Sequence, residues 1–324
     1  MSSIVTNSEI AKSTETKPAR IDVYERVTNS IIEQLEQGVR PWMKPWNAEH
    51  AAGRITRPLR FNGLPYSGIN ILMLWAKAED KGYTCPLWLT FNQTKELGGF
   101  VKKGERGSIV VYASTFKKSE ADDKGDEVER DIPFLKQYTV FNAEQCEGLP
   151  EKYYATKEPP NSTIERVDQA DRFFKNLNAD IREGGDKAYY TITHDYVRMP
   201  FLETFRDAET HAATMAHELC HWTRHPKRLD RDLGRKRFGD EGYAMEELVA
   251  ELGSAFLCAD LNITPELRAD HAEYLASWLH VLKNDKRAIF TAASYASKAV
   301  EFMHGLQPKN ETTSEASTAE RESV

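Results

Sequence analysis

The segment HELCH, His217–His221, constrains this chain more than any other part of its sequence. Four residues turn an α-helix by about 400°, so histidines at this spacing share one helix face and can bind one metal ion. The flanking stretch Thr210–His225 contains no Gly or Pro, and Pro226 follows it, which predicts a helix over about Glu209–His225. Between the two histidines, Glu218 can reach a water molecule at the metal, and the motif therefore predicts Glu218 as a catalytic general base.

A catalytic zinc site needs a third protein ligand, and acidic candidates lie on the next predicted helix, over about Gly242–Ala259. Glu247 and Glu251 are four residues apart and share a face, whereas Glu246 points about 100° away. This spacing favours Glu247 as the third metal ligand, with Glu251 behind it as the hydrogen-bond partner of a ligating imidazole. The reverse assignment stays open. Zn²⁺ is the expected ion, and Mn²⁺ or another divalent cation remains an alternative because two imidazoles and a carboxylate suit both.

Two further residues are candidates for stabilising an oxyanion beside the metal, namely Tyr243 and His194. His194 ends a predicted strand, Ala188–His194, which is the expected edge strand for pairing with a peptide substrate. The extended metzincin motif is excluded, since Arg224 and Lys227 occupy the positions where that class has Gly and His.

The chain has 324 residues, enough for two domains that each bury a core. No apolar run approaches the roughly 20 residues that span a bilayer, and the first 20 residues lack the apolar stretch of a secretion signal. Four cysteines without CxxC spacing make a disulfide framework improbable. These features predict a cytoplasmic protein with no membrane partner.

Hydrophobic periodicity and capping signals predict the α+β class, with an N-terminal α+β domain joined to a mainly helical domain that carries a small sheet. The N-terminal half is expected to contain helices over Asp22–Gln37 and Ile69–Lys81, a short helix from Thr90, and strands over Ser108–Phe116 and Phe134–Phe141. The later helices are expected over Ala269–Leu282 and Lys286–His304. The predicted division is a disordered lead-in (1–20), an N-terminal domain (21–150), a linker (151–162), a C-terminal domain (163–306) and a disordered tail (307–324).

The net charge of the chain is −7, but the segment Gly38–Lys118 carries 13 Lys and Arg against 5 Asp and Glu. Cations interleaved with aromatic side chains are typical of single-stranded nucleic-acid binding, in which bases stack on flat rings. Trp42 and Trp46, flanked by prolines, are expected to be hard to bury fully. The residues predicted to bind DNA are Trp42, Lys44, Trp46, Arg57, Arg60, Tyr66, Trp88, Phe91, Lys102, Lys103, Arg106, Lys117 and Lys118.

Two pairs of segments resemble a known family. HELCHWTRHPKRLDRD followed by GYAMEELVAELGSAFL is similar to the zincin-like C-terminal domain of the ArdC-type antirestriction proteins of conjugative plasmids. FNGLPYSGINILML and LWLTFNQTKELGGFVKKGERGSIVVY resemble the single-stranded-DNA-binding domain of that family, which also occurs on plasmid primases of the TraC type.

The resemblance implies binding of single-stranded DNA, protection of incoming plasmid DNA from host restriction during conjugation, and a gluzincin-like metallopeptidase site. It agrees with His217, His221 and Glu247 as the metal ligands and with Glu218 as the catalytic residue, and it names no protein or peptide substrate. The alternative is a protein that only binds and masks single-stranded DNA, in which the metal stabilises the fold.

Overall fold

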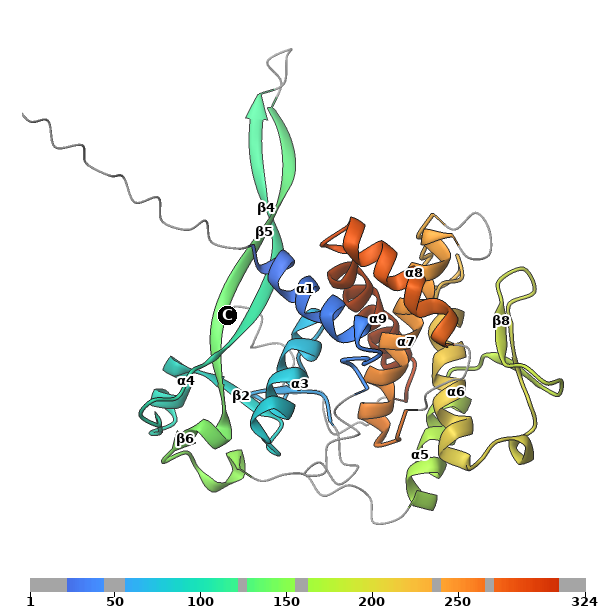
Figure 1. Ribbon diagram of the computed structural model, residues 1–324, viewed down its shortest axis with the longest axis horizontal. Helices are drawn as coiled ribbons and strands as arrows, with labels where there is room; N and C mark the ends of the chain where they lie inside the picture. The colour runs from blue at the N-terminus through green and yellow to red at the C-terminus, as the bar shows by residue number, and fades with distance from the viewer. Residues whose placement is uncertain are drawn as a thin grey trace, which may run out of the picture.

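The computed structural model describes residues 22–43, 56–121, 127–154, 163–234, 240–265 and 271–308. Helices and small sheets are mixed in the N-terminal half, whereas the C-terminal half is built mainly from helices (Figure 1). This arrangement confirms the predicted α+β class. The predicted disordered ends lie outside the described residues, apart from 307 and 308, as does most of the predicted linker, so the domain division stays a prediction.

Within the described part of the N-terminal half, the strands form two sheets. The larger has the strand order β1-β2-β5-β4, in which β1 and β2 are parallel and the other neighbours antiparallel, while β3 and β6 form a separate antiparallel pair. The elements are α1 (Val23–Glu36), β1 (Leu59–Arg60), α3 (Ile69–Lys81), β2 (Leu87–Thr90), α4 (Phe91–Glu96), β3 (Phe100–Val101), β4 (Ser108–Ala121), β5 (Glu127–Asn142), β6 (Cys146–Glu147) and the short 3₁₀ turns η2 (Ala143–Gln145) and η3 (Glu151–Tyr153).

The strands β4 and β5 form a ribbon that projects away from the rest of the molecule (Figure 1). Both strands are longer than the sequence predicts, since the antiparallel pairing continues out to Ala121 opposite Glu127. The outer part of the ribbon is rich in charged residues, so the alternation of apolar and polar residues that reveals a half-buried strand is absent there. Only the inner strand segments could be predicted from their sequence.

The described residues of the C-terminal half form five helices beside a three-stranded sheet of order β7-β9-β8. In this sheet β7 runs parallel to β9, and β8 is antiparallel to β9 at the edge. The elements are α5 (Thr163–Asn176), β7 (Asp180–Glu183), β8 (Tyr189–Thr191), β9 (Tyr196–Met199), the 3₁₀ turn η4 (Leu202–Thr204), α6 (Ala208–Trp222), α7 (Glu241–Leu261), α8 (His271–Asn284) and α9 (Ala288–Gly305).

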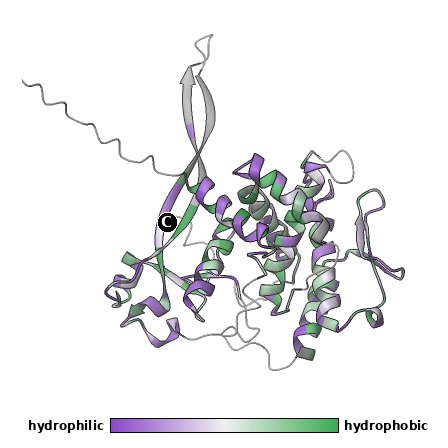
Figure 2. Ribbon diagram, viewed as in Figure 1, coloured by the Kyte–Doolittle hydropathy of each residue, from purple (hydrophilic) through white to green (hydrophobic). Residues whose placement is uncertain are grey.

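One continuous hydrophobic core joins the two halves. The helix α1 packs on the C-terminal helices, where the Tyr24 and Phe290 rings lie 4.5 Å apart and the Thr28 hydroxyl donates to the Lys286 carbonyl at 2.7 Å. On α3, the Trp75 ring meets Phe256 of α7 edge-on at 5.8 Å. Hydrophobic residues accordingly colour the helices at the centre of the molecule and the inner part of the β4–β5 ribbon (Figure 2).

Two expectations about the environment of the chain bear on the described residues. Within them, no helix combines the length and the apolar character needed to cross a membrane. All four cysteines are buried free thiols, which confirms that the fold does not depend on a disulfide framework.

Candidate metal centre

The helix α6 presents both histidines of the HELCH motif to the interior of the C-terminal half. Asp207 caps its first turn, where the side chain accepts a hydrogen bond from the Thr210 backbone amide at 2.8 Å. Because His217 and His221 are four residues apart, their rings stand on the same side of the helix, with centroids 4.9 Å apart. Both residues are buried.

The helix α7 approaches α6 closely because it has a glycine at the crossing. A Cβ atom on Gly253 would lie 2.7 Å from the Cys220 sulfur, closer than packed atoms can come. This close approach allows the acidic side chains of α7 to reach the imidazoles of α6.

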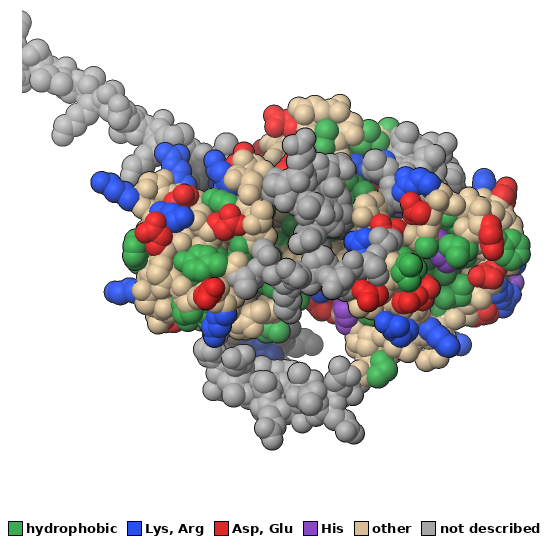
Figure 3. Space-filling model, turned by 90° about the horizontal axis from the view of Figure 1, so that it is seen from below, with side chains coloured by type: hydrophobic (Ala, Val, Ile, Leu, Met, Phe, Trp, Pro, Cys, Tyr) green, Lys and Arg blue, Asp and Glu red, His purple; other side chains and the backbone are tan. Residues whose placement is uncertain are grey.

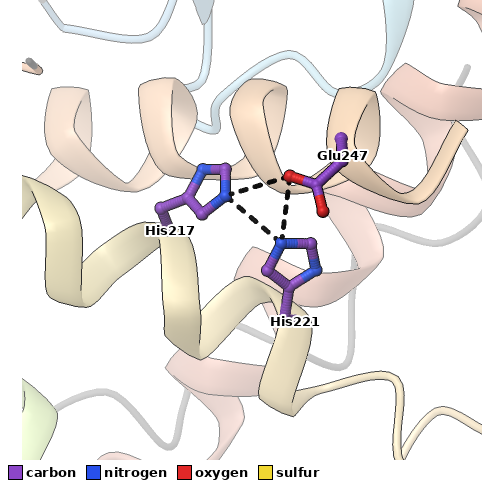
Figure 4. Close-up of side chains that lie close together, drawn as sticks. All are labelled: His217, His221 and Glu247. Carbon is purple, nitrogen blue, oxygen red and sulfur yellow. Dashed lines mark hydrogen bonds and ion pairs between the residues drawn. The ribbon is translucent and has the colours of Figure 1, made fainter. Parts of the chain in front are cut away.

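Three candidate ligand atoms converge between these helices (Figure 4). The Nε2 atoms of His217 and His221 are 3.2 Å apart, and each lies 3.6 Å from Oε2 of Glu247. All three ligand atoms lie within 4.8 Å of one another. Two imidazole nitrogens and one carboxylate oxygen are a donor set that suits zinc and other divalent transition metals.

The electrostatics of the cluster favour a positive charge at its centre. Burial disfavours the charged form of His221, but the carboxylates of Glu247 and Glu246 outweigh this effect and raise the pKa of the imidazole to about 10. Burial likewise opposes the charge on Glu247, and the imidazoles of His221 and His217 more than offset it, so the pKa of the carboxyl lies far below its usual range. The residues present therefore fit a divalent cation, which supplies that positive charge.

Glu246 orients His221 from the side away from the cluster. Its Oε1 lies 3.0 Å from Nδ1 of His221, and both carboxylate oxygens accept hydrogen bonds from the Arg231 guanidinium, each at 2.8 Å. Burial would raise the pKa of Glu246, but Arg231 and His221 together lower it to about 2. Sequence reasoning set Glu246 aside because it points away from Glu247, and that direction leads to the second nitrogen of His221. The signal that could have found this pair is Arg231, a buried cation ten residues beyond the motif.

Glu251 stands in a similar relation to His217. Its Oε2 lies 3.8 Å from Nδ1 of His217, while its Oε1 accepts hydrogen bonds from the Arg40 guanidinium at 3.2 Å and from the Trp42 indole at 3.3 Å. The structure thus brings Glu247 together with both Nε2 atoms and places Glu251 at the other ring nitrogen of His217. Sequence reasoning did not anticipate Arg40 and Trp42 here, since they lie more than 200 residues away along the chain.

Comparisons with known proteins agree with this architecture. Two family models match the chain: the N-terminal domain of anti-restriction factor ArdC over residues 21–141, and a zincin-like metallopeptidase over residues 168–295. The metal-free crystal structure of the antirestriction ArdC protein from the R388 plasmid is similar with a TM-score of 0.72 and 45% identity, covering 88% of this chain and 98% of that one. The chain belongs to the ArdC family.

Other relatives extend the comparison. A Mn(II)-bound structure of the R388 ArdC protein matches with a TM-score of 0.71 and 44% identity, over 88% of this chain and 98% of that one. An uncharacterized protein of Sinorhizobium fredii is 44% identical over 291 residues, covering 88% of this chain and 92% of its own. The Escherichia coli DNA primase TraC is 36% identical over 315 residues, and this ArdC-family chain spans 28% of its length.

Of the other predicted catalytic residues, Glu218 and Tyr243 lie on the two helices of the cluster, whereas His194 lies in a turn of the small sheet. Glu218 is buried on α6 beside His217, and its role as a base stays a prediction. Tyr243 begins the turn of α7 that leads to Glu247, and its hydroxyl lies 2.9 Å from that of Tyr274. Burial and the charge of Glu247 raise the pKa of Tyr243, so this residue keeps its proton near the cluster.

His194 lies in a different setting from the one its sequence suggests. The predicted strand Ala188–His194 is too long, because β8 ends at Thr191 and a turn follows in which Asp195 has a φ of 51°. His194 is exposed in this turn, with its ring 6.3 Å from that of Tyr196. A role in stabilising an oxyanion stays a prediction for Tyr243 and has no support from the contacts of His194.

Four of the residues predicted to bind DNA are buried, so their surroundings do not support that role, which stays a prediction. Trp42 and Trp88 are 0% and 1% exposed, so neither ring can receive a base. Tyr66 is buried as well, and burial raises the pKa of its hydroxyl to about 12. The Arg57 guanidinium is held by Asp260 through two hydrogen bonds of 2.6 and 2.7 Å. Each is enclosed by residues that the local sequence could not reveal.

The remaining predicted DNA-binding residues divide into two groups. Lys44, Trp46 and the side chain of Lys118 lie outside the described residues. Exposed or partly exposed side chains belong to Arg60, Phe91, Lys102, Lys103, Arg106 and Lys117. Among the described residues of the same half, other exposed aromatic rings were not predicted to bind DNA, and they include Phe61, Phe100, Tyr112 and Tyr138.

Proposed function

We propose that this ArdC-family protein binds single-stranded DNA through its N-terminal half and carries a metallopeptidase-type site in its zincin-like half. In this proposal it protects incoming plasmid DNA from restriction in the cytoplasm of the recipient cell. The observation that carries the enzymatic part is the convergence of His217, His221 and Glu247 next to Glu218. The similarity to the antirestriction ArdC protein of the R388 plasmid supports the antirestriction role.

The metal ligands in this proposal are Nε2 of His217, Nε2 of His221 and a carboxylate oxygen of Glu247. The relative with Mn(II) bound supports a divalent cation, and the donor set suits Zn²⁺ equally well. A divalent cation held by these atoms would act as a Lewis acid that polarises a peptide carbonyl, and it would lower the pKa of a water molecule bound to it. The Glu246 carboxylate accepts a hydrogen bond from a protonated Nδ1 of His221, which leaves the lone pair of Nε2 free to bind the metal.

Two side chains of the protein take part in the proposed reaction, one in proton transfer and one as a hydrogen-bond donor. Glu218 accepts the proton of the attacking water and passes it to the leaving amine, the general-acid and general-base role of a carboxylate. Tyr243 keeps its proton and can donate a hydrogen bond to the developing oxyanion, since its pKa lies above the usual range.

Two substitutions test the enzymatic part. We expect His217→Ala to abolish binding of Zn²⁺ or Mn²⁺, and Glu218→Gln to retain the ion but lose protection of an unmodified plasmid conjugated into a restricting host. Glu203→Gln, which changes an exposed carboxylate in the same half, is the control and should protect like the wild type. Full protection by Glu218→Gln would reject the enzymatic role and favour the masking function.

The DNA-binding part is supported by exposed rings beside exposed cations in the N-terminal half. Phe91 begins α4 and Phe100 begins β3, with 57% and 58% of their surface exposed, and Lys103 and Arg106 follow closely in the chain. In Figure 3, Lys and Arg side chains lie around the outer rim of this half, interspersed with hydrophobic side chains. This combination suits a single strand that is held by its phosphates and stacked by its bases.

Substitutions of these residues test DNA binding by the full-length protein. Loss of one stacking ring costs about 1–3 kcal/mol per base, so Phe91→Ala and Phe100→Ala should each weaken binding of an oligothymidine by roughly 5- to 150-fold. Lys103→Gln should reduce the slope of log K against log salt by about 0.7. Phe201→Ala, a similarly exposed ring in the zincin-like half, is the matched control. Equal affinities for all four variants would reject this surface.

A further inference from the structure

The N-terminal half reaches the candidate metal centre through the turn that follows α1. Arg40 and Trp42 both donate to one oxygen of Glu251, at 3.2 and 3.3 Å. Trp42 is fully buried, and its ring meets Trp278 of α8 edge-on at 5.8 Å. The Trp278 indole in turn donates to the Ala244 carbonyl of α7 at 3.1 Å, so the tryptophan pair is anchored to the helix that carries the carboxylates.

These donors act on one oxygen of Glu251 and leave the other for the histidine. Oε2 lies 3.8 Å from Nδ1 of His217, farther than a direct hydrogen bond, and Glu251 is only 5% exposed. A carboxylate at that nitrogen favours a proton on Nδ1 and keeps the lone pair on Nε2, the atom that faces Glu247. The donors on Oε1 help to fix the orientation of this buried carboxylate.

The two histidines are therefore supported from different parts of the chain. His221 is oriented by Glu246 and Arg231, both from the zincin-like half. The support of His217 runs through Glu251 to Arg40 and Trp42, from the half that resembles the ArdC N-terminal domain.

We propose that Arg40 and Trp42 are positioning residues of the metal centre, supplied by the N-terminal half. By holding Glu251 they hold His217, so the affinity of the site for a divalent cation depends on contacts that the zincin-like half does not contain. This inference rests on the metal site proposed above, and it adds a dependence of that site on the other half of the molecule.

The experiment measures the dissociation constant of Mn²⁺ or Zn²⁺ for full-length variants, by competition with a chromogenic chelator. Substituting a residue that orients a metal ligand lowers metal affinity by about 10- to 100-fold, which is the loss we expect for Glu251→Gln. Trp42→Phe and Arg40→Gln should each lower it by about 3- to 10-fold, since each leaves the other donor in place. In the Glu251→Gln background, neither substitution should lower it further, because the carboxylate through which they act is gone.

Trp75→Phe is the matched control. It removes the N–H of another buried tryptophan, which donates to the Thr56 carbonyl at 3.0 Å, and it should leave metal affinity within twofold of the wild type. If Trp42→Phe proves much less stable than Trp75→Phe, the double-mutant cycle of Arg40 and Glu251 decides by itself.

Two results separate failure of this inference from failure of the metal site. Wild-type affinity in His217→Ala would reject the site, and the inference with it. Loss of binding in His217→Ala, together with Trp42→Phe and Arg40→Gln values equal to the control or additive with Glu251→Gln, would overturn the inference alone.

Discussion

The pair formed by Glu246 and Arg231 offers a direct test of how the centre is held together. Both side chains are buried, 1% and 0% exposed, and two hydrogen bonds of 2.8 Å join them. Removing one partner of a buried ion pair costs about 3–5 kcal/mol, because the remaining charge is left in a poor solvent. Glu246→Gln keeps an acceptor oxygen but loses the charge, so we expect the lower end, a loss of about 3 kcal/mol in the free energy of unfolding.

The measurement is urea denaturation in the presence of a chelator, so that bound metal adds nothing to stability. The control is Asp80→Asn, which breaks the exposed contact between Lys77 and Asp80 and should cost less than about 0.5 kcal/mol. Removing both charges with Glu246→Leu and Arg231→Met should recover much of the loss, since no unpaired charge then remains.

The same substitution has a second readout. Because Glu246 lies 3.0 Å from Nδ1 of His221, Glu246→Gln should also weaken binding of the divalent cation by about 10- to 100-fold.

A loss of stability below about 1 kcal/mol, or a double variant less stable than either single one, would refute the view of Arg231 as a charge that depends on this carboxylate.

Two further predictions concern the helices that carry the site. Asp207→Ala should cost about 1 kcal/mol at pH 7. Hydrogen bonds from Thr210 and Arg206 lower the pKa of Asp207 to about 2 from 3.8, so its contribution is complete above pH 4 and is lost as the pH falls towards 2; thermal unfolding of both proteins across this range should converge, and a constant difference would contradict the capping role. Gly253→Ala should destabilise the protein by roughly 1–2 kcal/mol, because crowding against the Cys220 sulfur exceeds the gain in helix propensity. Chemical denaturation should show the loss relieved in a Cys220→Ala background, and a stabilised Gly253→Ala would be the opposite result.

Much of the fold could be predicted from local signals in the sequence. The helix α3 has the predicted bounds, Ile69–Lys81, since Gly68 and Gly82 flank it with positive φ values. The short helix predicted from Thr90 forms as α4, and it begins with a capping box: the Thr90 hydroxyl accepts from the Gln93 backbone amide, and the Gln93 side-chain oxygen accepts from the Thr90 backbone amide. Such interactions involve residues three or four apart, so they are visible to anyone who reads along the chain.

The features that could not be predicted from the sequence depend on residues that are far away along the chain. Loop tryptophans beside prolines looked hard to bury, yet Trp42 finds an acceptor 209 positions later, and Arg57, expected at a DNA surface, is neutralised 203 positions later. Short strands such as β3 and β6 likewise exist only because they pair with each other. In each case the local composition was read correctly, and the tertiary partner decided whether the side chain faced solvent.

The charges around the metal centre also come from residues that are far apart along the chain. Their sum says more about the ion that the site can hold than any single ligand does. Formal charges on or in direct contact with α6 and α7 around the two imidazoles come from four carboxylates and two guanidinium groups, namely Glu218, Glu246, Glu247, Glu251, Arg40 and Arg231. With both imidazoles neutral, as ligands of a cation are, these groups leave two negative charges in a largely buried region, and uncompensated buried charge is strongly unfavourable. One divalent cation balances that sum, and it does so only when Arg40 is counted. The electrostatic balance of the centre therefore involves both halves of the molecule. The zincin-like half holds the three candidate metal ligands, and the Arg40 guanidinium from the N-terminal half completes the balance of charge.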